Sequence, residues 1–258
     1  MKSKIAEAVK LRYSPVAIVF ADEKPEGALQ FKEGRRGCVI SMLNAAAKGR
    51  TAVFDRNTYG CIGGGAGLGF GNTYTRFPGG IEYFLSTGNK EFFESEEGKE
   101  LAKRRPLFVH GEAYKKTPEL AKTFIDALPY YDVPTKYVIF KPLEKLLPME
   151  KPEVVVFLAT PDQISALVVL ANYGRPGGDN VIVPWSAGCH SICIIPLNEA
   201  KSEAPKAVIG LTDVSARKYL EKDILSFSVP YKMFLEMEDN VEESFLTREE
   251  WQKIRERN

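Results

Sequence analysis

Short apolar runs bounded by polar residues predict the strands of this chain. Val154–Leu158 is continuously apolar, which suits a strand that is buried on both faces of a sheet. Val16–Phe20 is a second such run, and it lies between Pro15 and Asp22. By the same signal we predict further strands at Thr51–Phe54, Tyr137–Lys141, Val181–Val183, Ala207–Leu211 and Ile224–Val229.

Capping residues and apolar spacing between these runs predict helices. Thr160 and Pro161 provide a cap and a first-turn proline for a helix that reaches Tyr173. Thr117 and Pro118 begin another helix in the same way. A helix in the N-terminal segment would place Ile5, Ala8, Val9 and Tyr13 toward a core. Another helix is predicted after Thr247, where Thr247 and Glu250 have capping-box spacing. The remaining predicted helices are Val39–Lys48, Glu82–Lys103 with interruptions at Gly88 and Gly98, Pro118–Leu128 and Ser186–Ile195.

This alternation of elements predicts an α/β (or α+β) fold, a mixed sheet covered by helices, in one unit of residues 1–258. One ordering of elements occurs twice along the chain. A strand, a helix, a Gly-Arg pair and a short strand precede Cys61, and the same series precedes Cys189. An internal duplication with halves at 1–135 and 136–258 explains this order. The alternative is that α/β proteins reuse the pattern freely.

Charge and hydropathy exclude several classes of partner. The 35 basic and 34 acidic residues give a net charge of +1, so no global field recruits nucleic acid or an acidic membrane surface. No apolar run approaches the roughly 20 residues that span a bilayer. The charged N-terminal segment lacks the apolar core of a signal peptide, so we expect a cytoplasmic protein. In a reducing compartment, cysteines are free thiols, metal ligands or redox groups.

The four cysteines are the most distinctive candidates for chemistry. Cys38, Cys61 and Cys189 each follow a glycine, and Cys193 lies four residues after Cys189. Thiolates bind zinc and iron–sulfur clusters, and neighbouring glycines let backbone amides approach the sulfur atoms. The chain lacks a CxxC pair, the spacing that identifies a zinc ribbon or a ferredoxin. Cys193 is flanked by isoleucines, which favours a core position over a ligand position.

The spacing of Cys189 and Cys193 limits what this pair can do. On a helix, positions four apart share a face with Cβ atoms about 5–6 Å apart. A relaxed disulfide requires about 3.5–4.5 Å, so the two thiols suit one metal centre better than a bond to each other. His190 is poorly directed toward the adjacent Cys189 and is available to Cys38 or Cys61 from across the fold. His110 is typical of a structural strand-end residue.

Tyr59–Gly80 contains nine of the 21 glycines, so backbone shape matters more there than side-chain packing. Neither GxGxxG nor a Walker pattern is present. One interpretation is a glycine-rich loop that forms an anion nest. In the other, the glycines let a helix pack closely against a neighbour. The candidate cofactor-binding residues are Gly63, Gly64, Gly65, Gly67 and Arg76.

The segments GCIGGGAGLGF, FPGG, PEVVVFLATPDQ and SAGC resemble the domain of unknown function 169 family over nearly the whole chain. The resemblance implies one unit of this size, common in anaerobic microbes, without a settled activity. It also implies family cysteines at positions that match Cys38, Cys61 and Cys189.

Our leading hypothesis is a cytoplasmic redox or metal protein. Cys38, Cys61, Cys189 and Cys193 are its candidate ligands for an iron–sulfur cluster, with zinc or no metal as alternatives. Its expected partner is a small molecule or a redox protein. A second hypothesis is a binding module for an anionic small molecule, with buried structural cysteines. A third is a metal-free thiol enzyme with Cys61 or Cys189 as the nucleophile.

Overall fold

The structure is a computed structural model that describes residues 1–257. Its internal contacts divide the chain into two compact units. The larger unit comprises Met1–Phe70 and the chain from Tyr131 onward, and the smaller unit is Gly71–Tyr130. The predicted halves at 1–135 and 136–258 divide the chain at a different place. Within residues 1–257, every helix is too short or too polar to cross a lipid bilayer.

The larger unit contains a seven-stranded mixed sheet in the order β2-β3-β1-β4-β7-β6-β5. The β5–β6 pair is parallel, and the other neighbours are antiparallel. Every residue of β4 is buried, as its continuous apolar run predicts. The α/β class is therefore confirmed. The strands are β1 (Val16–Ala21), β2 (Ala52–Phe54), β3 (Tyr137–Pro142), β4 (Val154–Ala159), β5 (Val181–Ile182), β6 (Ala207–Gly210) and β7 (Leu225–Pro230).

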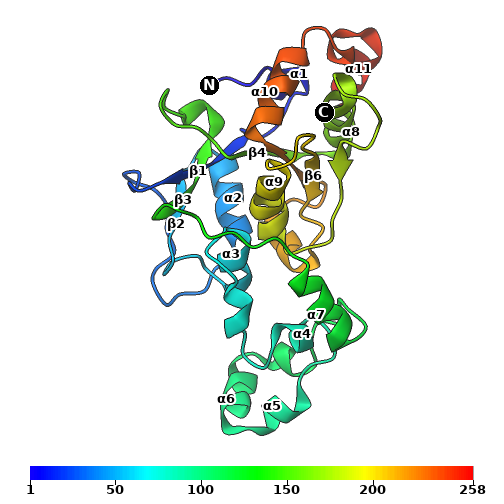
Figure 1. Ribbon diagram of the computed structural model, residues 1–258. Coiled ribbons are helices and arrows are strands. Elements are labelled where there is room, and N and C mark those ends of the chain that lie inside the picture. The colour runs from blue at the N-terminus through cyan, green and yellow to red at the C-terminus, as the bar shows by residue number, and fades with distance from the viewer. Residues whose placement is uncertain (258) are drawn as a thin grey trace. The chain divides into compact units, whose positions relative to one another are not determined.

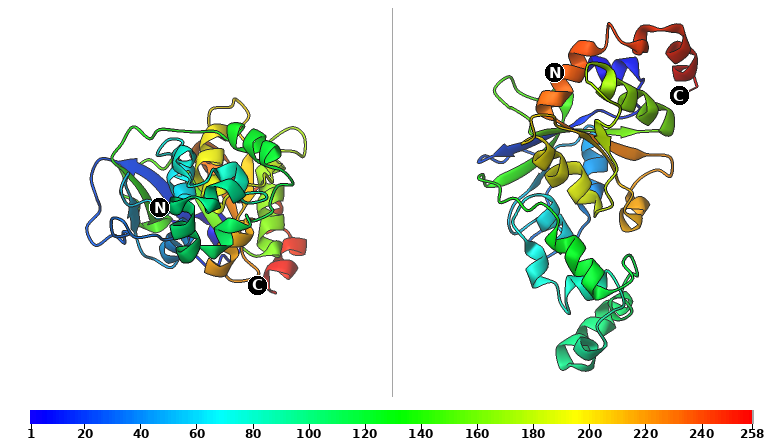
Figure 2. Two further views of the ribbon diagram at one scale, coloured as in Figure 1. Left: turned by 90° about the horizontal axis from the view of Figure 1, so that it is seen from below. Right: turned by 45° about the vertical axis from the view of Figure 1, so that its right-hand side comes forward.

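Helices cover both faces of this sheet (Figures 1 and 2). Side chains alternate along each strand, so Val16 and Ile18 enter one hydrophobic core while Ala17 and Val19 enter the other. The first core is covered by α2 (Val39–Ala47) and a helix over residues 188–199. The second core is covered by α1 (Lys4–Ala8), α8 (Pro161–Tyr173), α10 (Tyr231–Asn240) and α11 (Glu249–Arg255).

The two compared segments place their helices differently. In the first segment α2 follows β1, and in the second α8 follows β4. These helices lie on opposite faces of the sheet, because α2 belongs to one core and α8 to the other. This arrangement does not support the duplication, although the strand–helix–strand order itself is correct.

The helix α8 begins with a side-chain cap at Thr160, as the sequence predicts. Thr160 Oγ1 accepts a hydrogen bond from the Gln163 backbone N–H, and Gln163 Oε1 accepts one from the Thr160 N–H. This is a capping box. The same signal was wrong at Thr247, because α11 begins after Arg248 without a side-chain cap.

The helix over residues 188–199 continues through Pro196, where we expected it to end. Its centre is η4 (His190–Ile194), a π turn in which the Ile195 N–H bonds to the His190 carbonyl oxygen, and α9 (Ile195–Glu199) follows. The wider π turn precedes the proline and relieves the clash that its ring makes with the carbonyl four residues earlier.

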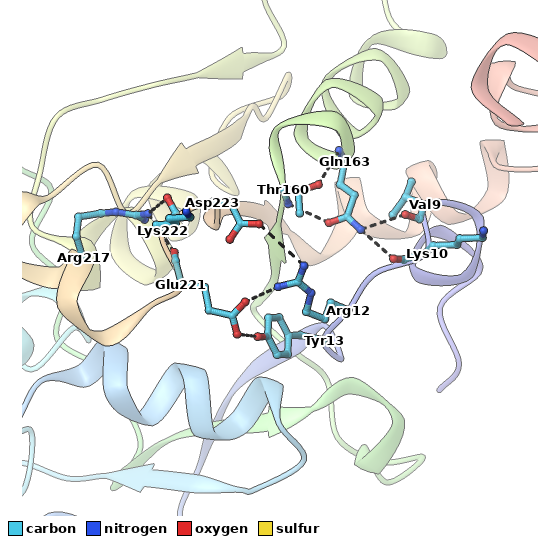
Figure 3. Close-up of polar contacts among 10 residues, drawn as sticks. All are labelled: Val9, Lys10, Arg12, Tyr13, Thr160, Gln163, Arg217, Glu221, Lys222 and Asp223. Carbon is cyan, nitrogen blue, oxygen red and sulfur yellow. Dashed lines mark hydrogen bonds and ion pairs between the residues drawn. The ribbon is translucent and has the colours of Figure 1, made fainter. Parts of the chain in front are cut away.

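The N-terminal segment is held to the larger unit by polar side chains (Figure 3). Gln163 Nε2 donates to the carbonyl oxygens of Val9 and Lys10, at 3.3 and 2.8 Å. The Tyr13 hydroxyl donates to the carboxylate of Glu221. These contacts fix the chain between α1 and β1.

A buried carboxylate caps α1. Glu238 of α10 is 9% exposed, and it accepts hydrogen bonds from the Ser3 hydroxyl and the backbone N–H groups of Lys4 and Ile5. The first N–H groups of a helix have no partner within the helix, and a carboxylate there also interacts favourably with the helix dipole. Glu238 therefore stabilises a helix of only five residues.

The smaller unit is helical. Three half-buried rings, Phe77, Phe84 and Phe108, pack together in it with centroids 4.7 to 5.6 Å apart. The predicted helix at Glu82–Lys103 is divided into three pieces, and the first break includes Gly88, as predicted. The second break is at Ser95, which caps the next helix by accepting the Gly98 N–H, so Gly98 lies inside that helix and does not interrupt it. The elements are η1 (Thr73–Arg76), α4 (Ile81–Phe84), α5 (Lys90–Glu94), α6 (Glu96–Arg104), η2 (Pro106–Val109) and α7 (Pro118–Asp126).

Candidate functional site

Three Gly-Cys pairs each stand at the start of a helix in the larger unit. Cys38 precedes α2 with extended backbone angles, and Cys61 precedes α3 (Ile62–Gly67) in the same way. Gly188 and Cys189 form the first turn of the 188–199 helix. The three thiols therefore lie close to backbone N–H groups that the helices leave without internal partners.

The first two pairs lie side by side. The Gly37 N–H donates to the Gly60 carbonyl oxygen at 3.1 Å, so the chain segments that lead into Cys38 and Cys61 are directly hydrogen-bonded. The Phe31 ring lies against both glycines, and a Cβ added at Gly37 would be 2.1 Å from it. A Cβ at Gly60 would be 2.7 Å from the Gly37 oxygen, and the φ of Gly60 is +82°. Only glycine fits both positions.

The glycine-rich segment at 62–67 forms the helix α3. A Cβ at Gly64 would lie 2.9 Å from Val39 Cγ2. A Cβ at Gly67 would lie 2.6 Å from Cys189 Sγ. The missing side chains thus let α3 approach α2 and the 188–199 helix closely. Of our two interpretations of the glycines, the structure has the close packing, and an anion-binding role for this segment stays a prediction.

The thiols near α3 have defined partners. Cys61 Sγ accepts a hydrogen bond from the Gly64 N–H at 3.2 Å, and Cys189 Sγ donates to the Gly63 carbonyl oxygen at 3.0 Å. Cys193 Sγ lies 3.9 Å from the Leu68 carbonyl oxygen, at the other end of α3. Cys189 and Cys193 thus share one helix face, as their spacing predicts. Their contacts on α3 are five residues apart, about 7.5 Å along the axis.

Burial and mutual repulsion keep these thiols protonated. Burial raises the pKa of Cys38, and the nearby Cys61 raises it further. Burial raises the pKa of Cys189 well above its usual value, and Cys61, Cys38 and Asp213 add to the shift. The three cysteines therefore lie close enough to interact through their charges. Without a compensating cation the thiol forms are favoured.

Cys61 is the thiol that solvent reaches. Its side chain is exposed, although the protein atoms packed around its sulfur desolvate the thiolate and raise its pKa. The Gly64 N–H and the positive charge of Arg36 act in the opposite direction. Cys38 is half-buried and Cys189 is buried, so access to the site decreases in the order Cys61, Cys38, Cys189.

Sequence reasoning missed Asp213, which contributes a carboxylate to the same site. Asp213 Oδ2 accepts from the Gly188 N–H at 3.2 Å, and Oδ1 accepts from the Ser215 N–H at 2.9 Å. Asp213 thereby caps both the 188–199 helix and η5 (Val214–Tyr219). The loop after η5 is held by Arg217, which donates to the carbonyl oxygens of Glu221 and Lys222 (Figure 3) and to that of Ile224. The signal was the Asp-x-Ser sequence of an Asx turn.

The remaining candidates are fully buried or belong to the smaller unit. Cys193 is fully buried in the core, and burial raises its pKa. His190 is also fully buried, which lowers its pKa to about 4, and its Nδ1 lies 3.8 Å from Cys189 Sγ. Arg76 and His110 are exposed and belong to the smaller unit.

The three thiols and Asp213 provide the donor atoms that soft and borderline metals prefer. As the side chains stand, residues 1–257 contain no group of three cysteine, histidine, aspartate or glutamate side chains in position to hold a metal ion. The site is therefore a cluster of neighbouring thiols and not a preassembled metal centre.

Comparisons with known proteins place the chain in a family. The family model described as uncharacterised ArCR, domain of unknown function 169, matches residues 4–240. Since this match spans most of the chain, the chain belongs to that family. Searches of curated proteins and of solved structures gave no match.

Proposed function

We propose that this member of the domain of unknown function 169 family is a cytoplasmic thiol protein that holds a thiophilic metal, as an iron–sulfur cluster or as zinc. Its ligands are Cys38, Cys61 and Cys189. The observation that carries the proposal is that three Gly-Cys pairs at three helix starts are connected by hydrogen bonds, from Gly37 to Gly60 and from Cys189 to Gly63. A small molecule or a redox protein is the expected partner, because three thiolates leave a coordination position open.

The negative charges that the three thiols and Asp213 can carry favour the binding of a cation. Burial raises the pKa of each of the three thiols, and the negative charge of Asp213 adds to each shift, as neighbouring cysteines do for Cys38 and Cys189. A site with several anionic groups in contact is unfavourable until positive charge enters it. A bound metal ion supplies that charge and deprotonates its thiol ligands.

Binding requires two thiols to change partners. Cys61 Sγ has to leave the Gly64 N–H, and Cys189 Sγ has to leave the Gly63 carbonyl oxygen. Both are rotations of short side chains, and the hydrogen bonds are weak because sulfur is a poor donor and acceptor. Asp213 stays at Gly188, where it adds negative charge near the metal.

Metal analysis of protein purified without oxygen tests the proposal. We expect stoichiometric metal, with sulfide and visible absorption if the metal is a cluster. Substitution of Cys38, Cys61 or Cys189 by serine should remove most of the bound metal. Cys193→Ala is the matched control and should keep it, because Cys193 lies in the core. Colourless wild-type protein without iron or zinc would contradict the proposal, and so would equal metal loss in the control.

Zinc titrations at several pH values provide a second test. Coordination displaces about three thiol protons, so the apparent affinity should rise steeply as the pH increases toward the raised thiol pKa values. The slope should be smaller in each serine variant, because one proton fewer is released. An affinity that does not change with pH would show that the thiols are not the ligands.

The anion-binding alternative predicts that ligand binding depends on Arg76 and not on the cysteines. Arg76→Ala would then abolish ligand-induced thermal stabilisation, and Cys61→Ser would leave it intact. The packing of Gly64 and Gly67 against Val39 and Cys189 leaves no room for an anion at those two glycines, which is why we favour the thiol function.

A further inference from the structure

We infer that Cys38 and Cys61 are a redox-active dithiol that closes to a disulfide on reaction with a low-molecular-weight disulfide. This inference goes beyond the proposed metal site, because it needs no metal. It begins from the hydrogen bond between Gly37 and Gly60, the residues that directly precede the two cysteines.

A backbone hydrogen bond holds the chain segments of the two cysteines together. A disulfide requires Cα atoms within about 7 Å. The 3.1 Å bond between Gly37 and Gly60 holds the two chain segments against each other immediately before Cys38 and Cys61. Phe31 packs on both glycines and fixes the crossing from one side. Both cysteines then begin helices, so rigid elements follow them.

Accessibility assigns different roles to the two thiols. Cys61 is exposed, and the Gly64 N–H points at its sulfur from 3.2 Å. Cys61 is therefore the thiol that an incoming disulfide meets first. Cys38 is half-buried beside it and serves as the resolving thiol.

Cys189 is the competing partner, and its surroundings make it the poorer one. It is 7% exposed, and its thiol already donates to the Gly63 carbonyl oxygen at 3.0 Å. Gly67 of α3 is packed against its sulfur and its backbone. Movement of Cys189 Sγ toward Cys61 therefore breaks a hydrogen bond and disturbs the contact with α3.

The reaction balances as a two-step thiol–disulfide exchange. The Cys61 thiolate attacks one sulfur of the small disulfide and forms a mixed disulfide, and one small thiol leaves with a proton. The Cys38 sulfur then attacks Cys61 Sγ, and the second small thiol leaves with the second proton. The two protein thiols lose two electrons and two protons in total, which the small disulfide gains.

Peptide mapping after oxidation tests this pair. The 258-residue chain, freed of metal with a chelator, is equilibrated with reduced and oxidised glutathione, trapped with an alkylating reagent and digested. We expect a Cys38–Cys61 disulfide, with Cys189 and Cys193 alkylated. Cys38→Ser should stop at the mixed disulfide and retain glutathione on Cys61. Cys193→Ala is the control and should behave as the wild type, because Cys193 is buried in the core.

Two results would overturn the inference. One is a disulfide that contains Cys189 in the wild type. The other is wild-type protein that keeps glutathione on Cys61 without forming the Cys38–Cys61 bond. Because the experiment uses metal-free protein, either result leaves the metal proposal untouched. Absence of metal in the anaerobic protein likewise does not affect the dithiol.

Discussion

Substitution of Gly67 by alanine tests whether α3 depends on its glycine face. The added Cβ would lie 2.6 Å from Cys189 Sγ and 2.8 Å from both the Cβ and the carbonyl carbon of Cys189. Two of these atoms are fixed by the helix backbone of Cys189, so rotation of the thiol alone does not relieve the clash. Either α3 or the 188–199 helix has to move.

The expected magnitude follows from two opposing effects. Overpacking of a well-packed site costs about 1–3 kcal/mol, and three contacts below 3.0 Å put Gly67→Ala near 3 kcal/mol. Alanine gains at most about 1 kcal/mol over glycine, because that value holds for a helix interior and Gly67 is the last residue of α3. The net loss of unfolding free energy is therefore at least about 2 kcal/mol, which corresponds to a Tm lower by at least about 4 °C.

Urea and thermal unfolding monitored by circular dichroism measure this loss. Gly178→Ala is the control, because a Cβ at Gly178 would meet no atom within 4 Å. We expect the control to stay within about 0.5 kcal/mol of the wild type. A Gly67→Ala protein as stable as the wild type, or more stable, would refute the close packing of α3 on Cys189.

Two further substitutions, each with its own control variant, test the cap of α1 and the contact at Gly60. Glu238→Ala should lower the unfolding free energy by about 2 kcal/mol, because it leaves buried N–H groups of α1 without an acceptor. Glu242→Ala removes an exposed ion pair and should change it by less than about 0.5 kcal/mol, so equal effects would contradict the capping role. Gly60→Ala should cost at least about 2 kcal/mol from left-handed backbone strain plus the clash with the crossing. Gly49→Ala has the same backbone strain without the clash and should lower the unfolding free energy by less. A larger loss for Gly49→Ala than for Gly60→Ala in chemical denaturation would contradict the close contact between Gly60 and Gly37.

The strands and most helices of the larger unit followed from local pattern. The runs at 16–20 and 154–158 are strands within one residue of the prediction at each end, because a buried strand needs a continuous apolar run. The helix at Tyr231–Asn240 was missed, although Met233, Phe234 and Met237 have helical spacing and are buried. That signal was present in the sequence and directly follows a strand that ends at Pro230.

The glycine helix and the contact between Asp213 and Gly188 could not be predicted from local pattern, although the Asp-x-Ser sequence signals the Asx turn at Asp213. Four glycines in the six residues of α3 oppose helix formation, and contacts with Val39 and Cys189 reverse this preference. Asp213 enters the site through a bond to the Gly188 N–H, 25 residues away in sequence. Contacts of this kind depend on the tertiary fold, which no local spacing encodes. For Cys193, in contrast, the flanking isoleucines correctly indicated a core position.

The glycine content of α3 also has a consequence for local dynamics. A six-residue helix with four glycines does not persist in isolation, because nucleation is costly and glycine is the least favourable residue apart from proline. Its backbone amides are therefore protected from hydrogen exchange only while α2 and the 188–199 helix hold it. Exchange at Gly65 and Leu68, whose N–H groups bond to the carbonyl oxygens of Cys61 and Gly64, reports directly on whether the three thiols are assembled.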